Sequence, residues 1–302
     1  MKLSYQYGPY LVFAAAMLWA SDAPFRVHLT ESLSSDLIVL AEHLIVAVLL
    51  LPFLYTSLPV IKALTYREWA AVLVIGVGGS ALALLLFTES FRYMNPSVVI
   101  LLQKLQPLIA ITLAVLVLKE ATPMRFWWWA VLALGGAYLI SFPDLMPQLY
   151  EGEVFNPHVI GVLLALGAAV LWAASTVLGR YLLSTISFGT MTALRFSTAL
   201  IFLLLYTGVT GSLGELTSIS SMDWLYLGII AVVSGAAGMT LYYIGLERSR
   251  ASVATLAELG FPLAAVLVNY IWLDAALLPA QILGMAILIW AVIGLSHVNQ
   301  EA

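Results

Sequence analysis

The sequence "LWASDAPFR" at residues 18–26 nearly recurs as "LWAASTVLGR" at residues 171–180. Trp19 therefore corresponds to Trp172, which lies 153 residues later in a chain of 302 residues. A similar shift lays "NPSVVILLQKLQP" at 95–107 on "RASVATLAELGFP" at 250–262. A repeat of this length indicates a duplicated unit of the fold rather than a short solenoid repeat.

The composition of the chain is that of an integral membrane protein. Hydrophobic residues make up 63% and charged residues 9%, with a mean hydropathy of +1.03, whereas a soluble domain has about 25% charged residues. About 20 apolar residues in a helix cross the hydrocarbon core of a bilayer. Ten such stretches are present, at residues 8–28, 36–56, 68–90, 96–118, 124–142, 158–180, 187–207, 223–246, 252–272 and 278–297.

The duplicated unit contains five of these stretches. We assign residues 1–142 to the first repeat, 143–157 to an extracytoplasmic linker and 158–302 to the second repeat. Because five is odd, the second copy enters the membrane from the opposite side, so the repeats are inverted. Inverted repeats with a site near the midplane are typical of alternating-access transporters. The sequence thus predicts an all-α integral membrane protein with ten transmembrane helices around a central cavity.

Lys and Arg residues are distributed unevenly over the connections between the stretches. With a cytoplasmic N-terminus, only Arg26 and Arg92 lie on outer connections. The inner connections then carry Lys2, Lys62, Arg67, Lys119, Arg125, Arg180, Arg248 and Arg250. Because positive residues accumulate on the cytoplasmic side, both chain ends are predicted to be cytoplasmic.

Several ionisable residues lie deep within the apolar stretches, where each is a candidate functional group. They are Asp22, Glu42, His43, Lys104, Arg195 and Glu258. Asp22 and Arg26 are one helical turn apart, so they form either a structural ion pair or part of a coupling site. His43 is either a proton relay or a hydrogen-bonded core histidine.

Two aligned prolines, Pro107 and Pro262, give the strongest indication of a site. A proline inside a helix kinks it and unpairs the carbonyl four residues earlier, here that of Gln103 and of Glu258. Irregular backbone at membrane depth is tolerated only against protein or a watered cavity. We therefore expect hinges at both prolines and a site near Gln103 and Glu258. Lys104 either meets a substrate carboxylate or pairs with Glu42 or Glu258.

Aromatic residues at matching depths complete the predicted pocket. Trp19 and Trp172 correspond to each other, as do Phe87 and Tyr242. Mostly apolar walls with a few converging polar groups are typical of a small-molecule site. The predicted substrate-binding residues are Trp19, Gln103, Lys104, Trp172, Tyr242 and Glu258.

The whole chain resembles the ten-helix EamA-type branch of the drug/metabolite transporter superfamily. The resemblance rests on the repeated stretch above, on "ALRFSTALIFLLL" (193–205), on "ASVATLAELGFPLAAVLVNYIWLD" (251–274) and on "QILGMAILIWAVIG" (281–294). One departure is Glu42, which stands where the usual arginine is expected opposite Arg195. Within the branch the chain is most similar to YddG-type exporters, which implies export of aromatic and other apolar or neutral amino acids across a bacterial inner (plasma) membrane.

Other functions are less well supported by the residues. One alternative is an exporter of hydrophobic cationic drugs or other small metabolites, although Lys104 argues against cationic cargo. An enzyme is not expected, because the chain lacks Cys and shows neither a nucleophile–base pair nor a metal-binding spacing such as H-E-x-x-H. Paired prolines also favour a moving carrier over a channel. We expect a monomer in the lipid bilayer, with no cofactor, metal or nucleic acid.

Overall fold

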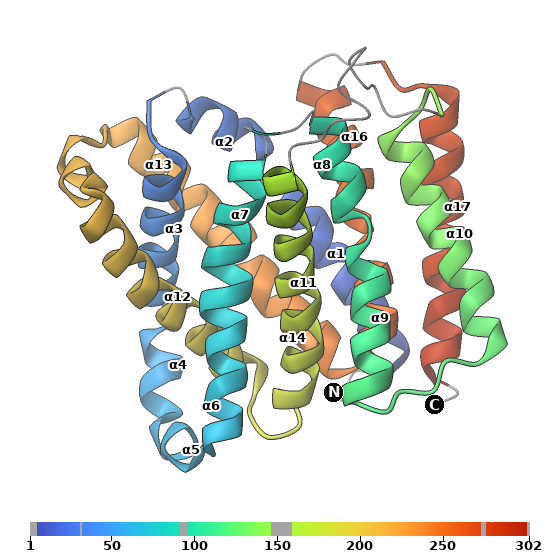
Figure 1. Cartoon of the computed structure of the whole chain (residues 1–302), viewed down its shortest axis with the longest axis horizontal. Helices are drawn as coiled ribbons and strands as arrows, with labels where there is room; N and C mark the ends of the chain where they lie inside the picture. The colour runs from blue at the N-terminus through green and yellow to red at the C-terminus, as the bar shows by residue number, and fades with distance from the viewer. Residues whose placement is uncertain are drawn as a thin grey trace.

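The computed structural model describes residues 5–30, 32–90, 93, 96–145, 159–272 and 276–300, and these are helices and their connections with no strand among them. The helices stand side by side in one bundle, and both chain ends lie at the same end of it (Figure 1). We call this end the terminus side and the opposite end the far side. Most of the linker expected at 143–157 lies outside the described residues.

Within the described residues, eleven helical pieces precede the last helix of the first half of the chain. They are η1 (Tyr5–Tyr7), α1 (Gly8–Ala20), α2 (Ala23–Leu29), α3 (Ser35–Leu49), α4 (Leu51–Thr56), α5 (Leu58–Ala63), α6 (Tyr66–Leu73), η2 (Val74–Leu82), α7 (Ala83–Ser90), α8 (Pro96–Gln103) and α9 (Gln106–Val117). The peripheral helix α10 (Met124–Ser141) follows.

The second half repeats this order with fewer interruptions. It comprises α11 (Val159–Leu182), α12 (Phe188–Thr210), η3 (Ser212–Ser218), α13 (Ser221–Ile230), η4 (Ala231–Gly238), α14 (Met239–Glu247), α15 (Ala251–Ala257), α16 (Gly260–Trp272) and α17 (Pro279–Gln300). The long pair α10 and α17 packs together at one edge of the bundle (Figure 1).

Sequence explains where several helices begin and break. Thr65 and Glu68 form a capping box at the start of α6, which satisfies backbone groups that have no partner inside the helix. Pro107 and Pro262 lie in the first turn of α9 and of α16, directly after the interruptions that separate these helices from α8 and α15, as expected for residues that cannot continue the hydrogen-bond ladder.

Two π-helical stretches, η2 and η4, were not predicted from the sequence. They occupy corresponding places in the two halves, and both are rich in glycine and alanine. In η2, a side chain at Gly79 would collide with Ser175 of α11, and in η4 a side chain at Gly238 would crowd Trp19 of α1. The small residues therefore allow close approach of neighbouring helices. Stretches of π-helix occur often at functional sites.

Among the described residues, seven helices are long and apolar enough to cross a membrane. They are Tyr66–Ser90, Val98–Val117, Val159–Leu182, Phe188–Thr210, Ser221–Glu247, Ala251–Val268 and Pro279–Gln300. The other three expected spans do not meet that measure. The stretch 8–28 is divided at Ser21 and Asp22, 36–56 is divided at Leu50, and α10 carries Arg125 and three consecutive tryptophans at 127–129.

Candidate functional site

The carboxylate of Glu258 lies at the break between α15 and α16 and accepts three hydrogen bonds. Thr176 of α11 and Tyr242 of α14 donate to Oε1 at 3.1 and 2.9 Å. Gln106, the first residue of α9, donates to Oε2 at 3.0 Å. The two hydroxyl oxygens of Thr176 and Tyr242 are themselves 2.9 Å apart. Hydrogen bonds to a charged acceptor are stronger than neutral ones, so these donors hold Glu258 in one position.

The guanidinium of Arg195, from α12, is bound by neutral groups of three other elements. Nε donates to Ser80 Oγ at 2.7 Å, Nη1 donates to Ser175 Oγ at 3.0 Å and to Tyr243 OH at 3.1 Å, and Nη2 donates to the Gly79 carbonyl at 3.3 Å. No carboxylate within the described residues forms an ion pair with it. Arg195 thus joins η2, α11 and α14 to α12.

The glutamine that contacts Glu258 is Gln106, which was not among the predicted site residues. Gln103, which aligns with Glu258 in the sequence repeat, is half-buried at the end of α8. Of the two alternatives for Lys104, pairing with Glu42 or Glu258 is not observed, because among the described residues the half-buried Lys104 has no ion-pair or hydrogen-bond partner for its side chain. Lys104 lies in the interruption between α8 and α9.

The predicted free carbonyl at Glu258 is not free. The amide of Phe261 donates to it at 3.1 Å, so the tightened turn after the break satisfies the acceptor that Pro262 leaves unpaired. The interruption of the helix is therefore present, but its backbone oxygen is occupied.

The four predicted aromatic residues form two ring contacts. Trp19 and Tyr242 have centroids 5.2 Å apart at an interplanar angle of 51°, and Phe87 meets Trp172 edge to face at 5.2 Å. Tyr242 is buried, whereas both tryptophans are half-buried. Because Tyr242 also binds Glu258, the Trp19 pair is directly joined to the carboxylate network.

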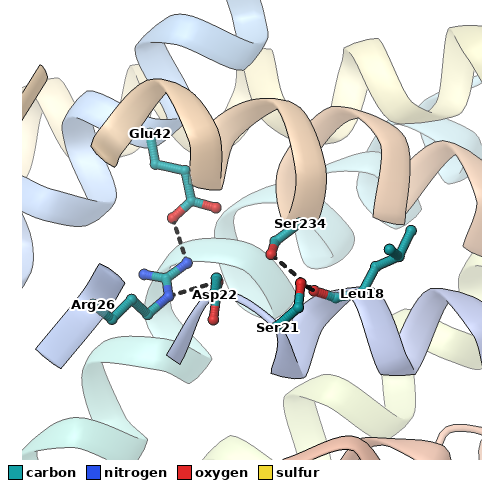
Figure 2. Close-up of polar contacts among 6 residues, drawn as sticks. All are labelled: Leu18, Ser21, Asp22, Arg26, Glu42 and Ser234. Carbon is teal, nitrogen blue, oxygen red and sulfur yellow. Dashed lines mark hydrogen bonds and ion pairs between the residues drawn. The ribbon is translucent and has the colours of Figure 1, made fainter. Parts of the chain in front are cut away.

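Asp22, Arg26 and Glu42 form an ion triad where α1, α2 and α3 meet (Figure 2). Arg26 Nε is 2.8 Å from Asp22 Oδ2, and its Nη2 is 2.7 Å from Glu42 Oε2. Both carboxylates are about nine-tenths buried, while the Arg26 side chain is 32% exposed. The local pair expected between Asp22 and Arg26 is present. Its extension to Glu42, sixteen residues away, was not predicted.

Contacts beside the triad fix the break between α1 and α2. The Leu18 carbonyl accepts from Ser21 Oγ at 2.7 Å and from Ser234 Oγ of η4 at 3.1 Å (Figure 2). His43, the neighbour of Glu42, is buried; its Nδ1 lies 2.8 Å from the Val39 carbonyl and its ring is 5.0 Å from that of Phe196. This is the geometry of a hydrogen-bonded core histidine, and its Nε2 has no partner in the described part of the chain.

Charged and aromatic groups collected inside a bundle of apolar helices are features of a multi-pass membrane transporter. The chain belongs to the EamA-like transporter family, whose model matches residues 6–142 and 159–297. It is 32% identical over 97% of its length to a riboflavin transporter, ImpX, of Fusobacterium nucleatum, of which it covers 98%.

Two further relatives are described as uncharacterized transporters. One, YwfM of Bacillus subtilis, is 31% identical over 63% of this chain and 60% of its own. The other, from Haemophilus influenzae, is 24% identical over 85% of this chain and 81% of its own. A crystal structure aligns with a TM-score of 0.76 over 97% of this chain and 98% of that one, at 17% identity. That likeness concerns the fold.

Proposed function

We propose that the protein is a secondary transporter of small, planar aromatic metabolites, with riboflavin as the first candidate substrate. The observation that carries the proposal is that most acceptor positions of the Glu258 carboxylate are already used. Gln106, Thr176 and Tyr242 each donate a hydrogen bond to it. A carboxylate offers about four acceptor positions, so about one remains for a ligand. Only about one further donor can therefore bind this carboxylate, which suits a ring system with a single N–H or hydroxyl at that point better than an ammonium with three donors.

Two further observations support an aromatic substrate. The ring pairs Trp19–Tyr242 and Phe87–Trp172 supply flat apolar surfaces, and contacts between aromatic rings add about 0.5–1.5 kcal/mol beyond the burial of area. The relative from Fusobacterium nucleatum, similar over nearly the whole of both chains, is described as a riboflavin transporter.

Export of aromatic and other neutral amino acids is the second candidate function. Lys104 favours it, because a half-buried ammonium without a partner among the described residues is suited to a substrate carboxylate. In this alternative the last acceptor position of Glu258 binds the substrate ammonium. Hydrophobic cations remain disfavoured by the charge of Lys104.

We further propose that ten helical segments cross the membrane as two inverted repeats. Three of the expected segments are not long or apolar enough by themselves to count as membrane-spanning helices, but each packs along a helix that is. These pairs are α1 with α14, α3 with α12 and α10 with α17. Chain ends on the same side of the bundle require an even number of crossings (Figure 1). Pro107 and Pro262, next to corresponding breaks, are the proposed hinges of alternating access.

Flux into liposomes that contain the purified protein tests the substrate. The panel consists of riboflavin, tryptophan, leucine, a quaternary ammonium ion and glucose. We expect saturable flux of riboflavin that exceeds that of every other compound. Flux of amino acids without riboflavin would replace the first candidate with the second. Flux of the quaternary ion alone would contradict both.

Two variants locate the site within the same assay. Glu258→Gln keeps the size of the side chain but removes its charge, so the three donors lose their anionic acceptor and flux should fall. Glu247→Gln, on the terminus side beside Arg248, is the matched control and should leave flux unchanged. Equal loss in both variants would argue against a role for Glu258 in the site.

A further inference from the structure

The connection between α9 and α10 is fastened to the start of α15 by the carboxylate of Glu120. Its Oε1 accepts from the Ala251 amide at 2.7 Å, and its Oε2 accepts from the Ser252 amide at 3.0 Å and from Ser252 Oγ at 2.6 Å. We call these three bonds the Glu120 clasp. A carboxylate is well suited to this place, because the first amides of a helix have no partner within it and carry partial positive charge.

Neighbouring contacts make the clasp part of a closed layer on the terminus side. Arg250 Nη1 donates to the Ala121 carbonyl at 2.7 Å, and its amide donates to Asn299 Oδ1 at 2.9 Å. The Asn299 side chain in turn donates to the carbonyls of Tyr5 and Arg248 at 3.0 and 2.9 Å. The first and last helices of the chain are thus tied to the start of α15.

The interface between α9 and α15 has polar links at both of its ends. On the terminus side is the Glu120 clasp, and at the helix breaks is the bond from Gln106 to Glu258. Between them, Ala114 of α9, Val177 of α11 and Ala251 of α15 form a buried apolar cluster. A ligand that competes for Glu258 weakens its bond with Gln106. The clasp is then the principal polar contact between the start of α15 and the connection that follows α9.

The corresponding helices on the far side are arranged differently. α9 packs against α15, but α8 packs against α11 and α16 packs against α1 and α10. Over their described residues, α8 and α16 have no comparable interface with each other. The two broken helices are therefore joined on the terminus side and separated on the far side, as expected for a carrier closed at one end.

We propose that the Glu120 clasp keeps the carrier closed on the terminus side. The three bonds must break before the site at Glu258 becomes accessible from that side. This inference rests on the proposed alternating-access function. Loss of the clasp should shift the population of the carrier toward states that are open on the terminus side.

Labelling of a buried cysteine measures this shift without any substrate. The native chain has no cysteine, and Val177→Cys places one in the buried cluster without added bulk. In lipid nanodiscs, this parent variant should react slowly with a water-soluble maleimide. Glu120→Gln in the same background should raise the labelling rate about tenfold, within the usual range for a bias between two states. Ser252→Ala, which removes one of the three bonds, should give a smaller increase.

The matched control is Glu247→Gln, which removes a carboxylate bound to Arg248 on the same side but outside the clasp. Its labelling rate should equal that of the parent. An unchanged labelling rate in Glu120→Gln, or an equal rise of the labelling rate in Glu247→Gln, would overturn this role of the clasp. If Glu120→Gln does not fold, an unchanged rate in Ser252→Ala overturns it instead. Failure of every candidate substrate to cross liposomes would overturn the proposed function and leave these labelling rates unaffected.

Discussion

Ser175 and Thr176 are adjacent on α11 and bind groups of opposite charge. Ser175 Oγ accepts from Arg195, while Thr176 Oγ1 donates to Glu258. Tyr243 and Tyr242 repeat this division on α14, since Tyr243 binds Arg195 and Tyr242 binds Glu258. The two charged groups are therefore held apart by the same pair of helices rather than paired with each other.

The donors to Glu258 are expected to act as a unit. Tyr242→Phe and Thr176→Val each remove a hydrogen bond to a charged group, worth about 1.5–3 kcal/mol. Because both hydroxyls bind the same oxygen and contact each other, the double variant should lose less stability than the sum of the single variants. Thermal unfolding of the wild type, the two single variants and the double variant measures this coupling. Strict additivity would show that the contact between the hydroxyls carries no energy.

The ion triad should respond unequally to loss of its members. Arg26→Gln leaves two buried carboxylates without their cation, whereas Glu42→Gln leaves Arg26 paired with Asp22. Breaking a fully buried pair costs about 3–5 kcal/mol, and the partial exposure of Arg26 reduces this to about 2–3 kcal/mol. Glu42→Gln should cost about half as much or less. A larger loss of melting temperature in Glu42→Gln than in Arg26→Gln would contradict this arrangement.

The two ring pairs should differ in their effect on the network at Glu258. Trp19→Leu removes the ring that contacts Tyr242, so it disturbs both stacking and the hydrogen bond to the carboxylate. Among the ring contacts of the described residues, Trp172→Leu removes the one with Phe87. We expect Trp172→Leu to weaken binding of aromatic substrates about two- to tenfold and Trp19→Leu to weaken it more. Equilibrium binding to the purified proteins measures both, with leucine as the non-aromatic comparison.

Single cysteines test the orientation predicted from the positive charges. Gly214, in η3, has open space around its Cα, and Gln300 is exposed at the end of α17. In intact cells, an impermeant thiol reagent should label Gly214→Cys and leave Gln300→Cys unlabelled until the cells are opened. Labelling in the reverse order would place both chain ends outside the cytoplasm.

Sequence reasoning could predict features that depend on local spacing. The membrane class follows from hydropathy, the interruptions of two helices from Pro107 and Pro262, and the Asp22–Arg26 pair from its separation of one turn. These features need no knowledge of how the helices pack.

Contacts between distant helices could not be predicted in the same way. Gln106 meets Glu258 only because α9 and α15 run side by side, and Arg26 reaches Glu42 only because the tertiary fold brings these two side chains of α2 and α3 together. Arg195 similarly finds its partners on η2, α11 and α14. The π-helical stretches have no distinct sequence pattern beyond small residues, which equally indicate close packing of ordinary helices.

Counterflow is the most direct test of a carrier with one alternately exposed site. Liposomes that contain the protein are loaded with unlabelled riboflavin and diluted into a trace of labelled riboflavin, with parallel samples loaded with tryptophan or with buffer. We predict transient accumulation of label only in vesicles loaded with a substrate, and its loss in Glu258→Gln. Alternating access would be contradicted if labelled riboflavin entered all vesicles equally and accumulated neither in those loaded with riboflavin nor in those loaded with tryptophan.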